Sequence, residues 1–424
     1  MTPEIKQRIE QICRGEVPEG YKKGKLGIVP EEWNETSFST LFTSTSDYTD
    51  DLDTYPLYSL TIEDGITPKT ERYERSHLVK KEDSYKIVRP NDYAYNPMNL
   101  RFGAVARHKG DMPVAVSGYY DIFTTEFESD LPFMDSFLTC GPMITYYNRV
   151  STGSLVEKQR VHFSQFLEFM LPLPSINERT KIAAILTTQD KVIELKEKRL
   201  AEKQRQKKYL MQQLLTGKKR LPGFSEEWKI KPLKKLTEKQ KKKNHGFQYR
   251  LVLSNSAQHG IVSQDQEFDK EIANEERIDG YYVVIPGAFV YNPRISVTAP
   301  CGPINVNETG ETGIMSPLYT VFTISSPQIS QDFLKYYFQS SCWYKYVKGV
   351  ANYGARHDRI SISDGDFFDM PIPLPTKEEQ SYIAKVLSAS NREIELLQQD
   401  IEQEKQKKKA LMQLLLKGIV RVKI

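Results

Sequence analysis

The sequence predicts an α+β protein of two mixed α/β globular domains and two long antiparallel helices that form a coiled coil, with a pseudo-two-fold internal repeat. Three observations predict this fold. A helical segment occurs twice, two globular blocks share motifs in the same order, and each helical segment follows one block. Repeats at a fixed spacing indicate a duplicated architecture. We expect an N-terminal helix and first domain at 1–170, a long helix at 171–220, a second domain at 221–371 and a second long helix at 372–424.

The two helical segments align without a gap at a spacing of 201 residues, from Pro172 and Pro373 to Gly217 and Gly418. About 40 residues in each copy contain neither proline nor glycine, which predicts a helix roughly 60 Å long. The glycines, with lysine and arginine around them, suit a helix C-terminus. Each copy begins with the hydroxyl and carboxylate of a predicted capping box, which pairs Ser175 with Glu178 and Thr376 with Glu379.

Apolar residues in both copies follow the 3–4 spacing of a coiled-coil seam. Neither helix could bury this stripe alone, so we expect the copies to pair with each other, with another protein as the alternative partner. A two-fold axis between two domain-plus-helix units makes the paired helices antiparallel. Polar residues at Lys203, Lys207, Glu404 and Lys408 interrupt the pattern. The predicted seam consists of Ile182, Leu186, Ile193, Leu200, Leu210, Leu214, Ile383, Leu387, Ile394, Leu397, Ile401, Leu411 and Leu415.

The globular blocks share anchor motifs at spacings that grow gradually from 195 residues. Each block opens near a Glu-Glu-Trp element, at Trp33 and Trp228, and each contains a Tyr-Asn-Pro element, at 95–97 and 291–293. Small insertions between shared anchors indicate one fold with different loops. Short apolar runs and turn residues predict mainly strands, and 330–346 predicts a helix.

Composition excludes several classes of protein. The chain has 424 residues and a net charge of +4, but residues 1–170 carry 19 basic and 26 acidic side chains, a net charge of −7. Binding of nucleic acid by the first block would therefore need a local basic patch. No apolar run is long enough to span a membrane, so we expect no membrane partner. Four widely spaced cysteines suggest neither a metal site nor a disulfide framework, and we expect a cytoplasmic protein.

The sequence contains no pattern typical of catalysis. It has no P-loop, no HExxH element and no Cys/His cluster, so we predict no catalytic residue, no metal site and no cofactor bound by this chain. The Tyr-Asn-Pro elements partly match the Asn/Asp-Pro-Pro-Tyr/Phe element of amino-methyltransferases. However, Met98 and Arg294 stand where the second proline is needed. A strand that ends in a turn is the better interpretation.

Basic clusters are the remaining candidates for function. Arginine and lysine beside glycine and aromatic residues suit contacts with phosphates and base edges. The alternative for each residue is a solvated loop. The candidate DNA-binding residues are Lys69, Arg72, Arg75, Arg101, Arg107, Lys241, Lys242, Lys243, Arg294, Lys345, Lys348, Tyr353, Arg356 and Arg359.

These features together resemble the specificity (S) subunit of type I restriction–modification systems. The resemblance covers essentially the whole chain. It rests on the two blocks with their Trp and Tyr-Asn-Pro elements and on motifs that frame each helix. The framing motifs are Leu-Pro-Leu-Pro at 171–174, Ile-Pro-Leu-Pro at 372–375, and Leu-Met-Gln-x-Leu-Leu-x-Gly at 210–217 and 411–418.

The resemblance implies a non-catalytic subunit that gives a larger enzyme its DNA specificity. The blocks would be target recognition domains, and each would read one half of a bipartite asymmetric site in double-stranded DNA. The coiled coil would set the gap and dock two methyltransferase subunits, which use S-adenosylmethionine. Restriction subunits with translocase and endonuclease activity, which use ATP and Mg²⁺, would join them. The alternative function is a coiled-coil scaffold whose globular domains bind protein partners.

Overall fold

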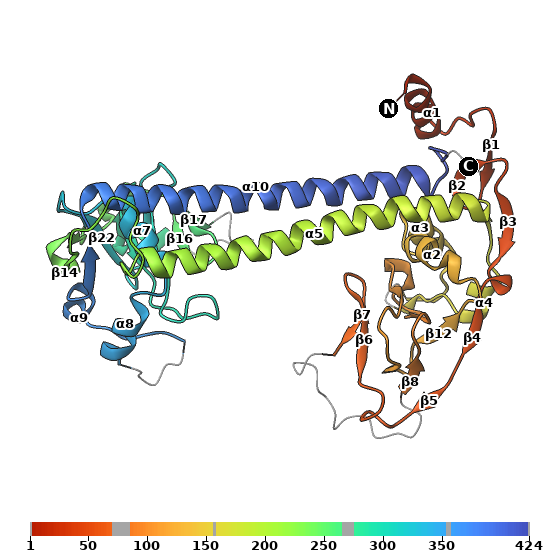
Figure 1. Cartoon of the computed structure of the whole chain (residues 1–424), viewed down its shortest axis with the longest axis horizontal. Helices are drawn as coiled ribbons and strands as arrows, with labels where there is room; N and C mark the ends of the chain where they lie inside the picture. Colours follow the sequence, from red (N-terminus) through yellow and green to blue (C-terminus); the bar gives the residue numbers. More distant parts are fainter. Residues whose placement is uncertain (1, 70–84, 156–157, 265–274, 353–357, 423–424) are drawn as a thin grey trace. The chain divides into compact units, whose positions relative to one another are not determined.

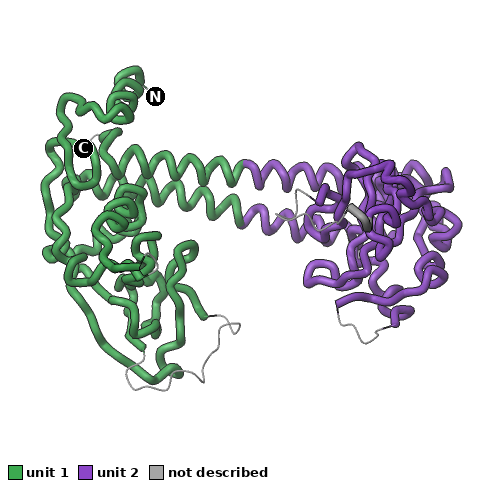
Figure 2. The backbone as a smooth tube through the Cα atoms, turned by 180° about the vertical axis from the view of Figure 1, so that it is seen from behind, with its two compact units in different colours: residues 1–197, 400–424 green, residues 198–399 purple. Residues whose placement is uncertain are grey.

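The protein consists of two compact units, each of which contains one part of both long helices. In the computed structural model, unit 1 comprises residues 1–197 and 400–424, and unit 2 comprises residues 198–399 (Figure 2). The structure describes residues 2–69, 85–155, 158–264, 275–352 and 358–422.

Unit 1 is a mixed α/β unit of short strands and helices (Figure 1). Its helices are α1 (Pro3–Cys13), α2 (Leu131–Phe137), α3 (Gly141–Val150) and α4 (Phe163–Leu167), with 3₁₀ turns η1 (Phe38–Thr40), η3 (Leu100–Phe102) and η4 (Glu128–Asp130). Its strands are β1 (Tyr21–Gly24), β2 (Gly27–Pro30), β3 (Asn34–Ser37), β4 (Thr43–Thr45), β5 (Tyr48–Thr49), β6 (Tyr58–Thr61), β7 (Gly65–Pro68), β8 (Tyr85–Val88), β9 (Tyr93–Tyr95), β10 (Val105–Arg107), β11 (Val114–Ser117), β12 (Asp121–Thr124) and β13 (Met170–Leu173).

Unit 2 is also a mixed α/β unit of short strands and helices. Its helices are α7 (Gln331–Gln339), α8 (Tyr344–Val350) and α9 (Asp364–Phe368), with 3₁₀ turns η6 (Leu233–Lys235), η7 (His245–Phe247) and η8 (Glu275–Gly280). Its strands are β14 (Lys229–Pro232), β15 (Thr237–Lys239), β16 (Leu253–Ser256), β17 (Gly260–Ser263), β18 (Tyr282–Val284), β19 (Phe289–Tyr291), β20 (Ile304–Val306), β21 (Gly313–Met315), β22 (Thr320–Ile324) and β23 (Pro371–Leu374). The long helices are α5 (Ile176–Leu214) and α10 (Lys377–Leu415).

The central sheets of the units have corresponding strand orders. In unit 1 the order is β10-β9-β12-β4, and in unit 2 it is β20-β19-β22-β15, with antiparallel pairing throughout. The smaller pairs also correspond, with β13-β3 and β6-β7 in unit 1 and β23-β14 and β16-β17 in unit 2. Both units therefore have the mixed α/β fold that the strand and turn pattern predicts.

Aromatic packing fills the core of each unit in the same way. Tyr93 of β9 stacks on Phe123 of β12 with ring centroids 5.1 Å apart, and Phe289 of β19 stacks on Phe322 of β22 at 5.4 Å. All four rings are buried. Offset-stacked rings are worth about 0.5–1.5 kcal/mol beyond the area they bury, so these pairs hold the middle strands of each sheet together.

Within unit 1 the first part of α5 runs antiparallel to the last part of α10. Asp190 pairs with Lys408 at 2.6 Å, and Lys196 pairs with Asp400 at 2.8 Å. Glu404 accepts hydrogen bonds from Lys196 and from the buried Gln189, and these bonds lower the pKa of Glu404 to about 2. Glu404 and Lys408, two of the polar residues that interrupt the apolar pattern, therefore form ion pairs between the helices.

Within unit 2 the last part of α5 runs antiparallel to the first part of α10. Lys203 pairs with Glu393 at 2.8 Å. Met211 and Leu214 of α5 join Ile383 and Leu387 of α10 in one buried cluster. Each of the thirteen predicted seam residues is buried or half-buried.

A buried carboxylate at the start of each long helix joins three distant parts of the chain. In unit 1, Glu178 of α5 accepts hydrogen bonds from the Trp33 indole at 3.3 Å and from Arg421, which follows α10, at 2.7 and 3.0 Å. In unit 2, Glu379 of α10 accepts hydrogen bonds from Trp228 at 2.9 Å and from Arg220, at 2.7 and 2.8 Å. Both glutamate side chains are 1% exposed.

These glutamates correct the prediction of a capping box. The hydroxyls of Ser175 and Thr376 accept from the backbone N–H groups of Glu178 and Glu379, as expected for N-caps. The carboxylates, however, bind the tryptophan and arginine. A buried carboxylate needs a positive partner, and the backbone N–H of the cap is a weaker one than arginine.

Two further details refine the sequence analysis. Gly217 and Gly418 end the long helices with φ of +68° and +67°, as predicted. The predicted helix at 330–346 is wrong in its length, because Ser340 separates α7 from α8. The Ser340 hydroxyl donates to the carbonyl of Tyr337 at 2.6 Å and accepts from the N–H of Cys342 at 3.1 Å, which replaces helical hydrogen bonds.

We predict that Glu178→Gln lowers the free energy of unfolding by about 3 kcal/mol, because the Arg421 guanidinium loses its buried charged partner and keeps only the exposed Glu32. Chemical denaturation monitored by the fluorescence of the tryptophans measures this change. Glu202→Gln is the matched control. Glu202 is exposed on the same helix and accepts one hydrogen bond, from Gln206 at 3.4 Å. Equal losses for the two variants would contradict a structural role for the buried carboxylate.

Candidate nucleic-acid interface

A loop after the central strand of each unit meets a second segment from much later in the chain. In unit 1 the N–H of Val161 donates to the carbonyl of Pro97 at 3.1 Å. In unit 2 the N–H of Ile360 donates to the carbonyl of Pro293 at 2.9 Å. We call the loop that begins with Tyr-Asn-Pro the YNP loop (96–104 and 292–303), and the segment that meets it the return segment (158–162 and 358–363).

The Tyr-Asn-Pro elements form turns, which confirms their structural interpretation. The side chains of Asn96 and Asn292 accept from the backbone N–H groups two residues later, at 3.1 and 3.0 Å. Asx turns of this kind shape a loop without help from secondary structure. The buried hydroxyl of Tyr95 donates to the carbonyl of Val161, so this tyrosine ties the YNP loop of unit 1 to its return segment.

In unit 2 this junction brings two predicted arginines together. Arg294 of the YNP loop and Arg359 of the return segment form an antiparallel backbone bridge. Arg294 is exposed. Arg359 lies 3.5 Å from Asp358, and its buried Nε has no hydrogen-bond partner among the described residues. Two arginines on adjacent backbone positions, one of them with an unused donor, suit an anionic ligand such as a phosphate.

In the same junction of unit 1, an arginine of the YNP loop meets a glutamine of the return segment. Arg101 of the YNP loop donates to the Gln159 side chain at 3.1 Å and lies over the Phe102 ring at 4.5 Å. Its buried Nε also lacks a hydrogen-bond partner in the described part of the chain. Gln159 lies 200 positions before Arg359, so the two junctions have a similar backbone but different side chains.

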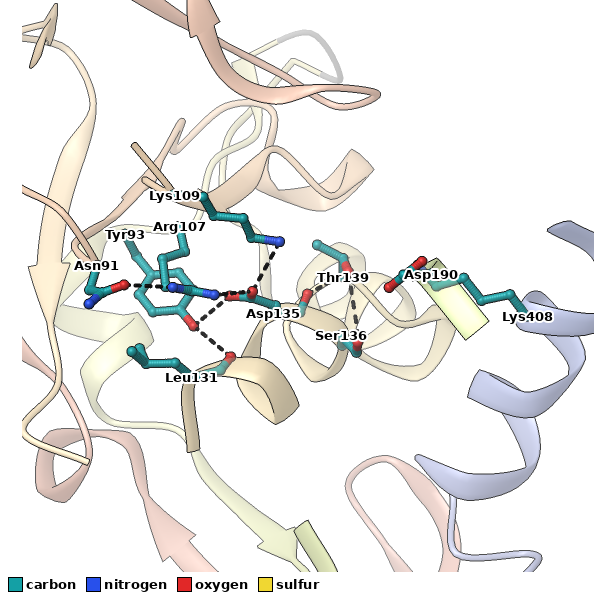
Figure 3. A network of polar contacts seen from close by, with 10 residues as sticks. All are labelled: Asn91, Tyr93, Arg107, Lys109, Leu131, Asp135, Ser136, Thr139, Asp190 and Lys408. Carbon is teal, nitrogen blue, oxygen red and sulfur yellow. Dashed lines mark hydrogen bonds and ion pairs between the residues drawn. The ribbon is translucent and has the colours of Figure 1, made fainter. Parts of the chain in front are cut away.

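Arg107 differs from the other predicted contacts, because its guanidinium group is already occupied (Figure 3). It donates to both carboxylate oxygens of Asp135 at 2.9 and 2.8 Å and to the Asn91 side chain at 2.6 Å. The Tyr93 hydroxyl donates to the carboxylate of Asp135, and Lys109 forms an ion pair with the same carboxylate at 3.2 Å. We therefore assign Arg107 a structural role and leave it out of the proposed DNA contacts.

The charges around Asp135 control its protonation. Burial on its own raises the pKa of Asp135, but hydrogen bonds from Arg107 and the positive charges of Lys109 and Arg107 outweigh burial and hold the pKa below its usual value. Burial and the nearby Asp135 raise the pKa of the Tyr93 phenol. The carboxylate is thus ionised at neutral pH and holds α2 against the central sheet.

Unit 2 has an ion pair at the corresponding place, with the charges reversed. Lys335 of α7 binds both carboxylate oxygens of Glu308 at 2.6 Å. Lys335 follows Asp135 by 200 positions, and Glu308 follows Lys109 by 199. The contact between the helix and the loop is therefore retained, while the surface charge that each unit presents differs.

The other predicted residues have various surroundings. Lys69 is exposed just after β7, and Lys345 and Lys348 are exposed on α8. Lys241, Lys242 and Lys243 are exposed after β15, and the Lys242 ammonium lies 5.8 Å from the centre of the Tyr249 ring. The remaining predicted residues, Arg72, Arg75, Tyr353 and Arg356, lie outside the described residues.

The sequence analysis missed two apolar residues beside the paired arginines. Val297 of the YNP loop is fully exposed, and Ile295 is 38% exposed. Exposed aliphatic side chains beside arginine suit contact with the methyl group of thymine. The position of Val297 four residues after the Tyr-Asn-Pro turn could have identified it as a loop residue.

No other class of site emerges from the described residues. Among them, no three His, Cys, Asp or Glu side chains are grouped as metal ligands would be. Within the same residues, no helix is both long and apolar enough for a membrane span. The four cysteines are present as free thiols.

Comparison with known proteins gives relatives that match nearly the whole chain. A protein of Methanocaldococcus jannaschii assigned as the MjaX type I restriction enzyme specificity subunit is 24% identical over 448 aligned positions, covering 96% of this chain and 97% of its own length. The MjaVIII specificity subunit of the same organism is 26% identical and covers 61% of this chain and 64% of its own length. No family model matches the chain.

A solved structure agrees with the fold. A chain from a study of the assembly and conformational transition of the type I restriction–modification system has a TM-score of 0.57 at 15% identity, covering 92% of this chain and 99% of its own length. At this identity, the likeness concerns the fold.

Both units are mixed α/β folds with corresponding central sheets. Their YNP loops and return segments meet in the same way but carry different side chains. The chain is similar over nearly its whole length to a protein assigned as a type I restriction enzyme specificity subunit, in agreement with the resemblance of the sequence motifs.

We predict that Asp135→Asn lowers the free energy of unfolding by about 3 kcal/mol at pH 7, because Arg107 loses its charged partner in a half-buried site. A carboxyl group whose pKa is lowered by folding stabilises the protein above its unfolded pKa, near 4, and this contribution is lost as the pH falls through the folded pKa. The difference between wild type and variant should therefore shrink below about pH 4.

Denaturant titrations at pH 7, 5 and 3.5 measure this difference. Asp111→Asn is the control. It changes an exposed residue in the loop after β10 and should change the free energy of unfolding by less than about 0.5 kcal/mol. A loss for Asp135→Asn that stays constant from pH 7 to pH 3.5 would show that the charge of Asp135 is not responsible.

Proposed function

We propose that the chain is the non-catalytic DNA-specificity subunit of a type I restriction–modification complex, and that each compact unit reads one half of a bipartite, asymmetric site. The observation that carries this proposal is the junction of the YNP loop and the return segment. Both units have this junction, with Arg101 and Gln159 in unit 1 and Arg294 and Arg359 in unit 2. Equal frames with unequal side chains favour two half-sites of different sequence.

The chemistry of the junctions supports contact with DNA. Arginine donates bidentately to guanine O6 and N7 or to phosphate oxygens, and each good bidentate base contact is worth about 1–3 kcal/mol of discrimination. Arg101 and Arg359 each have a buried Nε without a partner among the described residues. Burial of an unsatisfied donor is unfavourable, and reorganisation of the side chain on a phosphate or base edge would relieve it.

We further propose that α5 and α10 act as a spacer for the two readers. Each helix has 39 residues, so each is about 58 Å long. This length exceeds the roughly 34–36 Å of one duplex turn. The ion pairs of Lys196, Lys203 and Lys408 with the opposite helix support a fixed register within each unit.

The long helices also carry exposed apolar residues that suit docking of partner subunits. Leu195 of α5 is 65% exposed, and Leu396, which follows it by 201 positions, is 48% exposed. Two exposed leucines in equivalent positions favour two copies of one partner. We propose that these partners are the methyltransferase subunits, which supply the S-adenosylmethionine chemistry, and that ATP-dependent restriction subunits complete the complex.

The second candidate function is a scaffold whose units bind proteins. The net charge of −7 over residues 1–170 favours it, because an acidic block repels DNA. A gel shift of the chain with its methyltransferase partner on random duplex DNA separates the two functions. A retarded duplex band supports the specificity subunit, and an unshifted band supports the scaffold.

We predict that replacement of residues 17–170 by the corresponding block of another specificity subunit changes one half-site and leaves the other unchanged. Each mismatched base pair in the altered half-site should then cost about 1–3 kcal/mol. Selection of bound duplexes from a randomised library, followed by sequencing, gives both half-sites and the gap between them. A change in both half-sites, or in neither, would contradict the assignment of one reader to each unit.

We also predict that insertion of one heptad into both long helices, at positions 201 residues apart, lengthens the preferred gap by about 3 bp. Seven residues add about 10.5 Å, and one base pair rises about 3.4 Å. The same library selection measures the gap. A heptad in α5 alone is the control, because it breaks the register of the ion pairs and should weaken binding. A gap that stays constant with both insertions would exclude the spacer.

A further inference from the structure

Unit 1 contains a basic cavity that the reading of DNA by the loop junctions does not use. The cavity has a volume of about 450 Å³. It lies between the turn that joins β1 to β2, the helix α3 and the end of α10. Lys25, Arg149 and Lys417 line it together with Gly141 and Tyr146.

The three cations are not neutralised by the surrounding protein. No carboxylate lines the cavity, and Lys25, Arg149 and Lys417 form no ion pair within the described part of the chain. Glu35 is near enough to Tyr146 to raise the pKa of its phenol, but it is not among the lining residues. Three like charges around one space repel one another, and an anion within the cavity would relieve this repulsion.

Arg149 is held in place by its neighbours. Its guanidinium group donates to the backbone carbonyl of Lys25 at 2.8 Å and lies 5.1 Å from the centre of the Tyr146 ring. The hydrogen bond and the cation–π contact leave other N–H groups of the guanidinium free to donate. Arg149 therefore forms a fixed wall of the cavity and joins the β1–β2 turn to α3.

The start of α3 adds to the positive character of the cavity. The helix has ten residues and begins after its N-cap residue, Cys140. Gly141 has open space where a Cβ would stand, so a ligand can approach the backbone. Lys417 is close enough for its charge to act on the Cys140 thiol, so a side chain that follows α10 lies near the same helix end.

The shared fold of the two units does not require two of these cations, Arg149 and Lys417. Thr216 stands 201 positions before Lys417, and Gly349 stands 200 positions after Arg149, at the corresponding place in α8. Unit 2 thus folds without a lysine or an arginine at either position. Arg149 and Lys417 therefore need another explanation than the fold that the two units share.

We propose that this cavity binds a phosphate group through Lys25, Arg149 and Lys417. Arginine and lysine are the usual partners of phosphate oxygens. The volume exceeds that of a single phosphate, which leaves room for the group attached to it. A free phosphate compound and the backbone of a nucleic acid share this chemistry. The site is distinct from the loop junctions of the proposed function.

The test uses the full chain with inorganic phosphate and, separately, a duplex of random sequence. Lys417→Thr is the first variant, because threonine stands at the corresponding position of unit 2, and Lys25→Thr/Lys417→Thr is the second. Lys23→Thr, an exposed lysine of the same hairpin, is the control. Calorimetry at constant ionic strength measures binding, and thermal unfolding verifies that each variant folds.

We expect saturable phosphate binding by wild type and by the control, weakened about ten-fold by Lys417→Thr and further by the double variant. If Lys417→Thr weakens binding of the duplex and inorganic phosphate does not bind measurably, the bound phosphate group belongs to a nucleic acid backbone. Binding of both probes that is unchanged in the double variant would overturn the proposal. Because inorganic phosphate carries no sequence, this outcome is independent of whether the units read half-sites.

Discussion

The buried glutamate at the start of each long helix is the constraint on which the rest of the structure depends. Glu178 binds Trp33 at the entrance of unit 1 and Arg421 beyond α10, and Glu379 does the same with Trp228 and Arg220 in unit 2. In each unit one carboxylate therefore fixes the first strands, the head of one helix and the tail of the other. A buried charge without its partner is strongly unfavourable, so these three segments must assemble together.

On this frame, the two units differ in the side chains that face solvent. The ion pair between Lys109 and Asp135 in unit 1 corresponds to that between Glu308 and Lys335 in unit 2, with the charges exchanged. The contact of Arg101 with Gln159 corresponds to the paired arginines Arg294 and Arg359. Contacts that position the backbone are thus kept, and the groups available to a ligand vary. The proposed reading of two different half-sites would require such a separation of a shared backbone frame from variable surface side chains.

Local signals in the sequence predicted the ends of the helices and the turns correctly. Ser175 and Thr376 act as N-caps, and Gly217 and Gly418 have the positive φ expected of a C-terminal glycine. Each of these features depends on residues within one helical turn. The partners of Glu178 could not be predicted, because Trp33 and Arg421 are far away in the sequence.

The candidate site was harder to predict for the same reason. As an arginine beside other basic residues, Arg107 is a plausible DNA contact from the sequence. Its guanidinium group is already bonded to Asp135, which lies 28 residues further along the chain on α2. Arg294 and Arg359 were both predicted, yet only the fold brings them together. Residue type indicates which side chains can bind an anion, and tertiary structure decides which of them are already neutralised.

A pair of double-mutant cycles tests the central claim most directly, with Glu178→Gln and Arg421→Gln in one cycle and Glu379→Gln and Arg220→Gln in the other. If the two clusters hold their units in the same way, both cycles should give coupling energies of about 2 kcal/mol in the free energy of unfolding. A coupling energy near zero in either cycle would contradict the account, because that carboxylate would not then depend on the arginine from the tail of the opposite helix.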